Sequence, residues 1–218
     1  MDIETTEKLK ETGKFDNMSL SADVKEHSLE MHLPYIYKML SRNFSSPSEY
    51  PPLVPILVGN TNEEAEKMYG QILAPYLVDP TSVFVISSDF CHWGARFDYT
   101  YYVSEDGSKG FSLGKGDSTP TKPTIHESIG ILDRLAMDAI EGGQHKDFLK
   151  ELKRTGNTVC GRHPIGVMMA AIEVLEHKSQ SAASSGKGRF KFVRYERSSD
   201  PEDFDDSSVS YASAYAII

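Results

Sequence analysis

Short apolar runs alternate along the chain with amphipathic segments, which is the pattern of an α/β protein. The clearest apolar run is Val83–Ile86, which follows a turn signal and stops at two serines. A β-branched run of this kind is typical of a strand buried on both faces of a parallel sheet. Leu53–Gly59 has the same character, and its Pro55 predicts a position near a sheet edge. With a helix between them, over about residues 61–77, the two runs predict one right-handed strand–helix–strand unit.

Apolar residues at three- and four-residue steps predict the remaining helices. A stripe that includes Leu29, Leu33 and Ile36 predicts a helix, interrupted by Pro34 after a short first turn. Similar spacing predicts helices over 124–140, 146–154 and 165–177, and alternation predicts strands over 189–197 and 209–218. We therefore predict a single domain over residues 1–218, with a mainly parallel central sheet covered by helices on both faces and with inserted loops at 103–123 and 178–189.

Charge and composition narrow the class of protein. The chain has 32 acidic and 23 basic residues and a net charge of −9, which argues against a nucleic-acid surface or binding to an anionic membrane. No apolar run approaches the roughly 20 residues of a membrane-spanning helix, and the acidic beginning of the chain does not resemble a signal peptide. Two cysteines suit free thiols in a reducing compartment. These features predict a cytoplasmic protein, with the nucleus as a further location.

Candidate chemistry follows the run Val83–Ile86 directly. Asp89, Cys91 and His92 place an acid, a thiol and an imidazole within four residues, and open α/β sheets hold their active sites just beyond such strand ends. The alternative is a polar turn in which Asp89 caps a loop and His92 packs on Trp93. The pattern supports both interpretations equally.

Two more positions, His27 and Cys160, carry candidate groups. His27 follows Glu26 near a helix start, so it is either an active-site imidazole with its orienting carboxylate or, as the pattern favours, an ordinary helix-start residue. Cys160 lies just before a helix, where the helix dipole favours a thiolate, and is a candidate metal ligand or reactive thiol. For an isolated cysteine a small buried residue is the commoner alternative.

Common catalytic and metal-binding motifs are absent from the sequence, including Cys-x-x-Cys, His-Glu-x-x-His, the nucleophile elbow and the dinucleotide fingerprint. What remains is a scattered set at strand ends and helix starts, which an α/β fold can gather into one site. A transition metal held by imidazole and thiolate, with His92 as acid and base, is chemically sensible for this set. The spacing of the residues alone does not establish it.

Four blocks of sequence resemble the Memo family, which is named for mediating cell motility driven by receptor tyrosine kinases. The blocks are Glu26–Tyr35, Ser87–Gly94, Cys160–Gly166 and Asp206–Ala212, and they occur in the family's order. The Memo family is in turn similar in fold to class III extradiol dioxygenases, which are non-haem iron enzymes. The resemblance covers nearly the whole chain apart from the two loops, and it implies this dioxygenase-like fold.

Site roles follow from the resemblance residue by residue. It implies that His92 is the acid/base histidine, that His27 is a pocket histidine, and that Asp89 lines the same pocket. It implies Cys160, together with His92, as ligands of an iron or copper ion. The family's other two metal histidines have no counterparts here, so we expect an N-terminally incomplete sheet and a half-built metal site, or no metal at all.

Three functions remain open at this stage. The first is a Memo-like protein that acts in signalling to the cytoskeleton, in cell motility or invasive growth, with phosphotyrosine peptides or signalling proteins as partners and with redox metal binding. The second is an iron- or copper-dependent oxidoreductase, although a thiolate in place of a carboxylate shifts the metal preference toward copper or zinc. The third is an inactive fragment that only folds.

Overall fold

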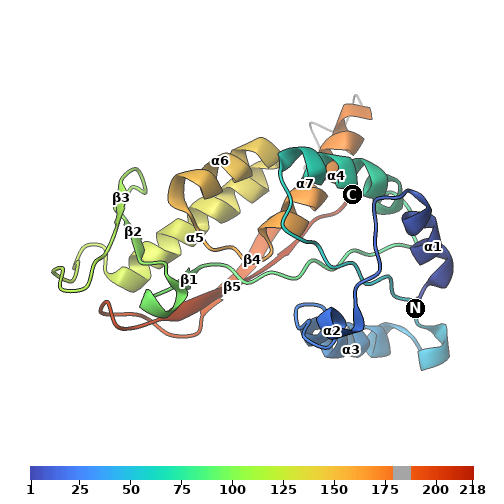
Figure 1. The fold of residues 1–218 in the computed structure, drawn as a ribbon, viewed down its shortest axis with the longest axis horizontal. Helices are drawn as coiled ribbons and strands as arrows, with labels where there is room; N and C mark the ends of the chain where they lie inside the picture. The colour runs from blue at the N-terminus through green and yellow to red at the C-terminus, as the bar shows by residue number, and fades with distance from the viewer. Residues whose placement is uncertain (179–187) are drawn as a thin grey trace. The chain divides into compact units, whose positions relative to one another are not determined.

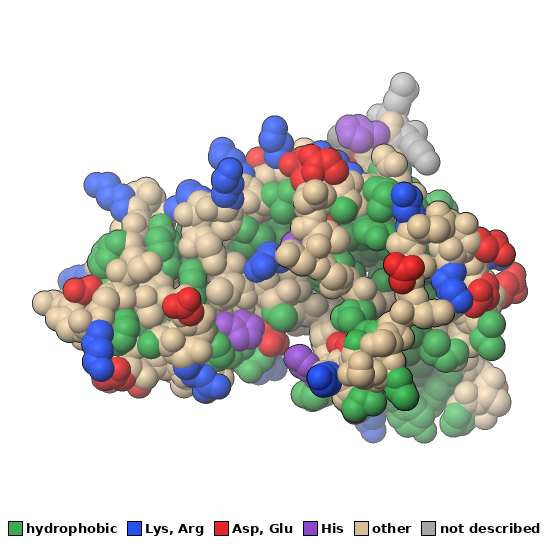
Figure 2. All heavy atoms as spheres, in the orientation of Figure 1, with side chains coloured by type: hydrophobic (Ala, Val, Ile, Leu, Met, Phe, Trp, Pro, Cys, Tyr) green, Lys and Arg blue, Asp and Glu red, His purple; other side chains and the backbone are tan. Residues whose placement is uncertain are grey.

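A computed structural model describes residues 1–178 and 188–218, and within it the chain divides into two compact units, Met1–Gly59 and Asn60–Ile218 (Figure 1). The predicted loop at 178–189 lies almost entirely outside the described residues. On the face drawn in Figure 2, acidic and basic side chains are interspersed.

The first unit is helical. Its helices are α1 (Ile3–Glu11), α2 (Leu20–Asp23) and α3 (Leu33–Asn43), with single 3₁₀ turns η1 (Glu30–His32) and η2 (Pro47–Glu49). The short turn η1 leads directly into α3, where Pro34 occupies the first turn, so the predicted interruption is confirmed. No residue of α3 is buried, and Leu33 and Met39 of its apolar stripe are largely exposed.

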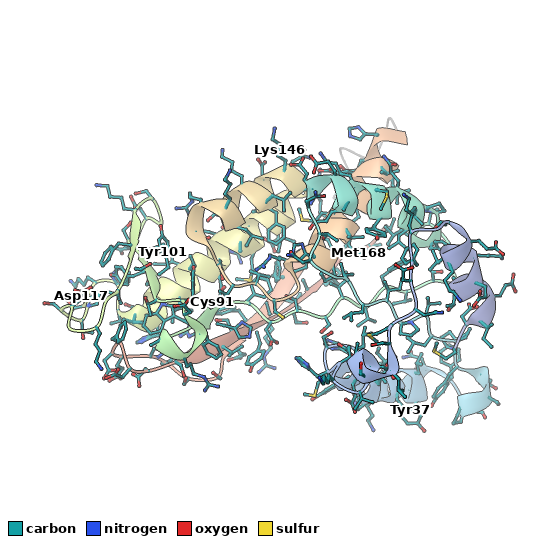
Figure 3. The ribbon with its side chains drawn as sticks, viewed as in Figure 1. Tyr37, Cys91, Tyr101, Asp117, Lys146 and Met168 are labelled. Carbon is teal, nitrogen blue, oxygen red and sulfur yellow. The ribbon has the colours of Figure 1, made fainter. Side chains whose placement is uncertain are left out.

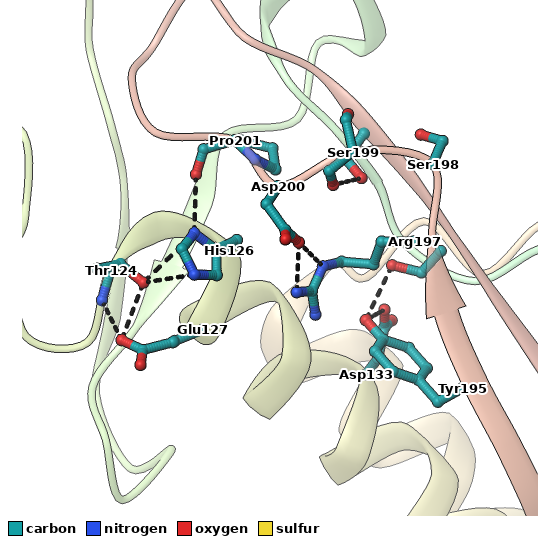
Figure 4. Close-up of polar contacts among 12 residues, drawn as sticks. Thr124, His126, Glu127, Asp133, Tyr195, Arg197, Ser198, Ser199, Asp200 and Pro201 are labelled. Atoms are coloured by element: carbon teal, nitrogen blue, oxygen red, sulfur yellow. Dashed lines mark hydrogen bonds and ion pairs between the residues drawn. The ribbon is translucent and has the colours of Figure 1, made fainter.

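The second unit contains four longer helices, namely α4 (Glu63–Leu77), α5 (Ile125–Gly142), α6 (His145–Thr155) and α7 (Arg162–Lys178). All four confirm predicted helices. Asn62 caps α4 by accepting a hydrogen bond from the Ala65 N–H, as acids and amides at helix starts commonly do. Thr124 and Glu127 form the capping box that begins α5 (Figure 4).

Every strand pair in the described residues is antiparallel. The strands are β1 (His92–Trp93), β2 (Tyr101–Val103), β3 (Gly110–Ser112), β4 (Lys191–Arg197) and β5 (Ser208–Tyr215), with the 3₁₀ turn η3 (Ala95–Phe97) after β1. One sheet has the order β1-β5-β4, and β2 and β3 form a separate hairpin. The hairpin places part of the predicted loop 103–123 in regular structure, whereas β4 and β5 confirm the two predicted C-terminal strands.

The mixture of helix and sheet is confirmed, but the predicted parallel central sheet is wrong for the described residues. Neither Leu53–Gly59 nor Val83–Ile86 is a strand, and the strands that do form pair antiparallel. Val83 is 88% exposed and Val85 53% exposed, so this run is not buried on both faces. Its β-branched composition favours an extended backbone, but a strand also needs a neighbour within hydrogen-bonding distance. No described segment is hydrogen-bonded to it as a strand.

The hydrophobic core of the second unit consists of two clusters. One joins the C-terminal half of α5 to α6, α7 and the turn at Phe90, and its members include Ile140, Phe148 and Met169. The other surrounds Trp93 with the hairpin and the first half of α5. The stretch 90–93 contributes to both clusters, so the turn that carries the candidate site is anchored on each side by buried side chains.

Candidate functional site

Two turns far apart in the sequence lie side by side in the second unit, and together they carry Asp89, His92 and Cys160. The Cys160 N–H donates to the Asp89 carbonyl oxygen at 3.1 Å. The Gly161 N–H donates to Ser88 Oγ at 2.9 Å. These bonds join 88–92 to 157–161, so Asp89 and His92 lie on one turn and Cys160 on the turn beside it. We name this pair of segments the paired turns.

Thr158 fixes the backbone of His92 within the paired turns. Its Oγ1 accepts the His92 N–H at 2.7 Å and lies 3.2 Å from the His92 carbonyl oxygen, to which it donates. One hydroxyl therefore satisfies both main-chain groups of His92. No motif pointed to Thr158, which lies 66 residues away from His92 in the chain.

The His92 ring is held in one tautomer. Nδ1 lies 3.0 Å from the Phe90 carbonyl oxygen, which can only accept, so Nδ1 carries the proton. In the neutral ring the lone pair is then on Nε2. That nitrogen lies 3.6 Å from Asp89 Oδ2, beyond ordinary hydrogen-bond length, and forms an ion pair with it when the ring is protonated. The arrangement suits a group that accepts a proton or binds a ligand through Nε2.

The two cysteines have opposite environments. Cys160 is exposed just before α7, so the alternative of a small buried residue does not apply to it. Cys91 is fully buried, and burial raises the pKa of its thiol well above the usual value (Figure 3). Only Cys160 is therefore placed to react or to bind a ligand at the surface.

Beneath the paired turns, Asp133 of α5 organises a buried network. Its Oδ1 accepts the Cys91 N–H at 3.1 Å and the Asn157 side-chain amide at 3.0 Å. Its Oδ2 accepts the Tyr195 hydroxyl at 2.8 Å, and this bond is drawn in Figure 4. One carboxylate thus ties both turns to β4. Burial raises the pKa of Asp133 despite these hydrogen bonds.

A second buried network joins three helices behind the Cys160 turn. Glu66 of α4 is 1% exposed and accepts from His145 Nε2 of α6 at 2.6 Å through one oxygen. Its other oxygen lies 2.7 Å from His163 Nδ1 of α7 and also accepts from the Thr61 hydroxyl at 3.1 Å. Burial alone would raise the pKa of Glu66, but these hydrogen bonds outweigh it and the pKa lies below the usual value.

Sequence reasoning missed Glu66, Asp133 and His145, because each looks like an ordinary polar position on an amphipathic helix. His163 belongs to a recognised block, but its partner is 97 residues away. The orphaned nitrogens, His145 Nδ1 and His163 Nε2, are buried and have no hydrogen-bond partner. A buried carboxylate between two imidazoles is visible only once the helices are packed.

His27 lies in the first unit and is exposed. Glu26 accepts from the Ser28 and Leu29 N–H groups, so it caps the following turn and does not orient the His27 ring. The local geometry therefore matches the helix-start interpretation, and the role implied for His27 by the family resemblance stays a prediction.

Comparison with known proteins assigns the family. Residues 1–215 match the family described as Memo-like protein. Protein MEMO1 of Homo sapiens is 41% identical over 201 residues, which are 92% of this chain and 59% of that protein. Protein MEMO1 of Xenopus laevis is 40% identical over 207 residues, or 95% of this chain and 61% of that protein.

A relative from a more distant organism supports the same family assignment. A MEMO1 family protein of Schizosaccharomyces pombe is 39% identical over 207 residues, covering 94% of this chain and 63% of the relative. The chain spans about three fifths of the length of the relatives it matches. The predicted resemblance is confirmed over nearly the whole chain, which therefore belongs to the Memo family.

Proposed function

We propose that the chain is a Memo-type signalling protein, acting toward the cytoskeleton and cell motility, and that the paired turns are its recognition surface. Family membership over residues 1–215 supports the class of function. The observation that carries the choice of surface is the hydrogen bonding that joins 88–92 to 157–161, because it places three polar, partly exposed side chains on neighbouring backbones. No helix in the described part of the chain is long and apolar enough to cross a membrane.

The proposed ligand is a phosphotyrosine peptide. Arg162 is exposed in the first turn of α7, next to Cys160, and a guanidinium binds phosphate through paired hydrogen bonds. The helix N-terminus adds a favourable field for an anion. Asp89 brings a carboxylate to the His92 side, so a phosphate group fits on the Arg162 side of the paired turns.

Fluorescence polarisation tests this binding with a phosphotyrosine peptide from a receptor tyrosine kinase tail and its unphosphorylated counterpart. We expect tighter binding of the phosphorylated peptide and about a tenfold loss in Arg162→Ala, the size expected for a charge-assisted hydrogen bond. Arg42→Ala, an exposed arginine of α3, is the matched control. Equal affinity for both peptides, or an undiminished affinity in Arg162→Ala, contradicts the proposal.

The second candidate function, metal-dependent oxidoreduction, is favoured by the His92 tautomer. That tautomer leaves an Nε2 lone pair for an iron or copper ion, and the exposed Cys160 sulfur is a donor that copper accepts well. The fit is incomplete, because no three His, Cys, Asp or Glu side chains in the described residues are grouped to hold one ion. We therefore assign no catalytic step to a metal.

Metal content decides between the two candidates. Iron and copper are measured after purification of the wild-type chain, Cys160→Ala and, as a matched thiol control, Cys91→Ala. Stoichiometric metal that is lost only in Cys160→Ala favours the oxidoreductase. Substoichiometric metal that is equal in all three favours the signalling role. A chain that binds neither metal nor phosphopeptide fits the third alternative, a fragment that only folds.

A further inference from the structure

Three polar side chains form one hydrogen-bonded network that adjoins the first turn of α7. Glu66 of α4 lies between two imidazoles, 2.6 Å from His145 Nε2 of α6 and 2.7 Å from His163 Nδ1 of α7. We name these three residues the Glu66 network. Glu66 and His145 are buried, and the His163 side chain is 18% exposed. Because His163 follows Arg162 in the chain, the network contacts the turn that carries the proposed phosphate-binding arginine.

Close packing of the helices holds the Glu66 network in place. A Cβ on Gly166 of α7 would collide with Glu66 Oε2 and would lie 3.0 Å from His145 Nε2, so the glycine lets α7 reach this pair. The His145 backbone N–H donates to Glu173 of α7 at 2.8 Å, which joins the start of α6 to the same helix. The position of the first turn of α7 therefore depends on the hydrogen bonds of the network.

The hydrogen bonds also determine where protons reside. Burial alone would raise the pKa of Glu66, but the hydrogen bonds from both imidazoles outweigh it, so Glu66 is ionised and both facing ring nitrogens donate. The other two ring nitrogens, His145 Nδ1 and His163 Nε2, are buried without a hydrogen-bond partner, and each can take a proton. One carboxylate balances one buried imidazolium but not two. The network therefore has an anionic state and a neutral state that holds one more proton.

The charged groups around the network carry both signs. They are Glu63 and Lys67 of α4, Lys146 of α6, and Arg162 and Glu173 of α7. Carboxylates, lysine and arginine ordinarily keep their charge between about pH 5.5 and about pH 8, whereas imidazole changes its charge in this range. The printed side-chain hydrogen bonds of the network join it to neither His92 nor Cys160. A change of charge in this range therefore belongs to the two imidazoles of the network.

We propose that the Glu66 network is a proton-linked regulator of the phosphate site. Glu66 and His145 act through His163 as positioning residues, and uptake of one proton by the network raises the affinity for an anion at Arg162. The inference rests on the proposed function of the paired turns and adds its regulation. The neutral state removes a negative charge close to Arg162, so an anionic ligand binds better as the pH falls. Because linkage is reciprocal, the bound anion also favours the protonated network.

The probe is a sulfotyrosine peptide with the sequence of the phosphotyrosine peptide. A sulfate keeps its charge over the range of interest, whereas a phosphate gains a proton near about pH 6. Fluorescence polarisation gives the affinity of the probe for the full chain between pH 5.5 and pH 8. We expect the affinity of the wild type to rise about fivefold toward the lower pH, which is the order of effect of one charge near a protein surface.

Glu66→Gln tests the network directly. It removes the carboxylate that balances the added proton, so we expect an affinity that does not change with pH. Glu64→Gln, an exposed position on the same helix, is the matched control and should keep the pH dependence of the wild type. A substitution that only loosened the fold would lower the affinity by a similar factor at every pH, so the pH profile separates regulation from a structural effect.

Nuclear magnetic resonance of the ring nitrogens tests the wild type without any substitution, and so does not depend on the folding of Glu66→Gln. We expect the signals of His145 and His163 to shift together between pH 5.5 and pH 8, with uptake of one proton shared by the pair. Saturation with the sulfotyrosine peptide should move this transition to higher pH.

Three results would overturn the inference and leave the proposed function standing. The first is a wild-type affinity that is the same at every pH. The second is a pH dependence that Glu66→Gln retains, or that His92→Gln abolishes while Glu66→Gln does not. The third is the absence of any shift in the ring signals of the network. If neither the phosphotyrosine nor the sulfotyrosine peptide binds at any pH, the proposed function itself is contradicted, and the inference with it.

Discussion

At the scale of single residues, burial divides groups of the same type into reactive and inert ones. Cys160 is exposed before α7, whereas Cys91 is fully buried and has a raised thiol pKa. We predict that iodoacetamide modifies the native chain once, at Cys160, and modifies both cysteines in denaturant. Mass spectrometry of the intact chain and of its peptides measures this directly. Rapid modification of Cys91 under native conditions would show that the Trp93 cluster opens readily.

Glu66 couples stability to pH. Its pKa is lower in the folded chain than the reference value of 4.5, so the folded state favours the carboxylate over the acid. The stability that it contributes is therefore present above about pH 4.5 and is lost as the pH falls through the folded pKa. Urea unfolding of wild type and Glu66→Gln between pH 3 and pH 7 tests this. We expect the variant to be less stable at pH 7 and the difference to shrink below pH 4.5.

The control for this experiment is Glu64→Gln, an exposed position on the same helix. We expect its stability to follow that of the wild type at every pH. A constant gap between wild type and Glu66→Gln over the whole range would mean that the ionisation of Glu66 does not contribute, and that the substitution acts through packing alone.

At the scale of elements, two helices can approach each other closely where one of them carries a glycine, which has no side chain. A Cβ on Gly70 of α4 would lie 2.8 Å from the Ala171 nitrogen of α7, which is backbone and cannot rotate away. We predict that Gly70→Ala costs about 1–3 kcal/mol of unfolding free energy by overpacking, as measured by urea denaturation. Gly142→Ala, with open space at the end of α5, is the matched control.

The control should not lose stability, because alanine is the better helix former by about 1 kcal/mol. Equal effects of the two substitutions would mean that α4 and α7 are separated in solution, or that they adjust without cost.

The longer helices and the two C-terminal strands were predictable from the sequence, whereas the parallel pairing predicted for Val83–Ile86 was wrong, for physical reasons. The limits of α5 follow from the local capping box at Thr124 and the left-handed Gly143, so a short window of sequence contains the signal. The run Val83–Ile86 carries an equally clear preference for an extended backbone. Whether it becomes a strand depends on a partner far away in the chain, and composition alone does not report that partner.

At the scale of the whole molecule, the candidate site also combines residues that a local sequence pattern marks with residues whose partners are far away in the chain. Asp89, His92 and Cys160 were recognisable in blocks that resemble the Memo family, and the structure brings the backbones of Asp89 and Cys160 into contact. The supporting groups were not recognisable. Apart from Thr61, which is five residues from Glu66, the partners of Asp133 and Glu66 lie 24 to 97 residues away, so no local pattern marks the two networks.

The two units also differ in how much core they contain. In the first unit Leu9 is the one buried hydrophobic residue, whereas the second unit has two clusters of buried side chains around α5 and α7. Local opening requires less free energy where fewer apolar contacts are lost. Stability is therefore expected to be uneven along the chain, with low local stability in α3, which, like the shorter α2, has no buried residue.

Hydrogen exchange measures this difference amide by amide. We predict that the α5 and α7 amides exchange slowest, near the rate set by global unfolding, and that the α3 amides exchange orders of magnitude faster. Both α3 and α5 are regular helices. Because most of the stability of a helix in a protein comes from packing of its apolar face, we attribute the difference in exchange rate to packing. Exchange of α3 as slow as that of α5 would require a contact that covers Leu33 and Met39, both of which are exposed. Leu33→Ser separates the two cases. If α3 is solvated, the substitution leaves the exchange of its amides nearly unchanged; if its apolar stripe is covered, the substitution accelerates their exchange.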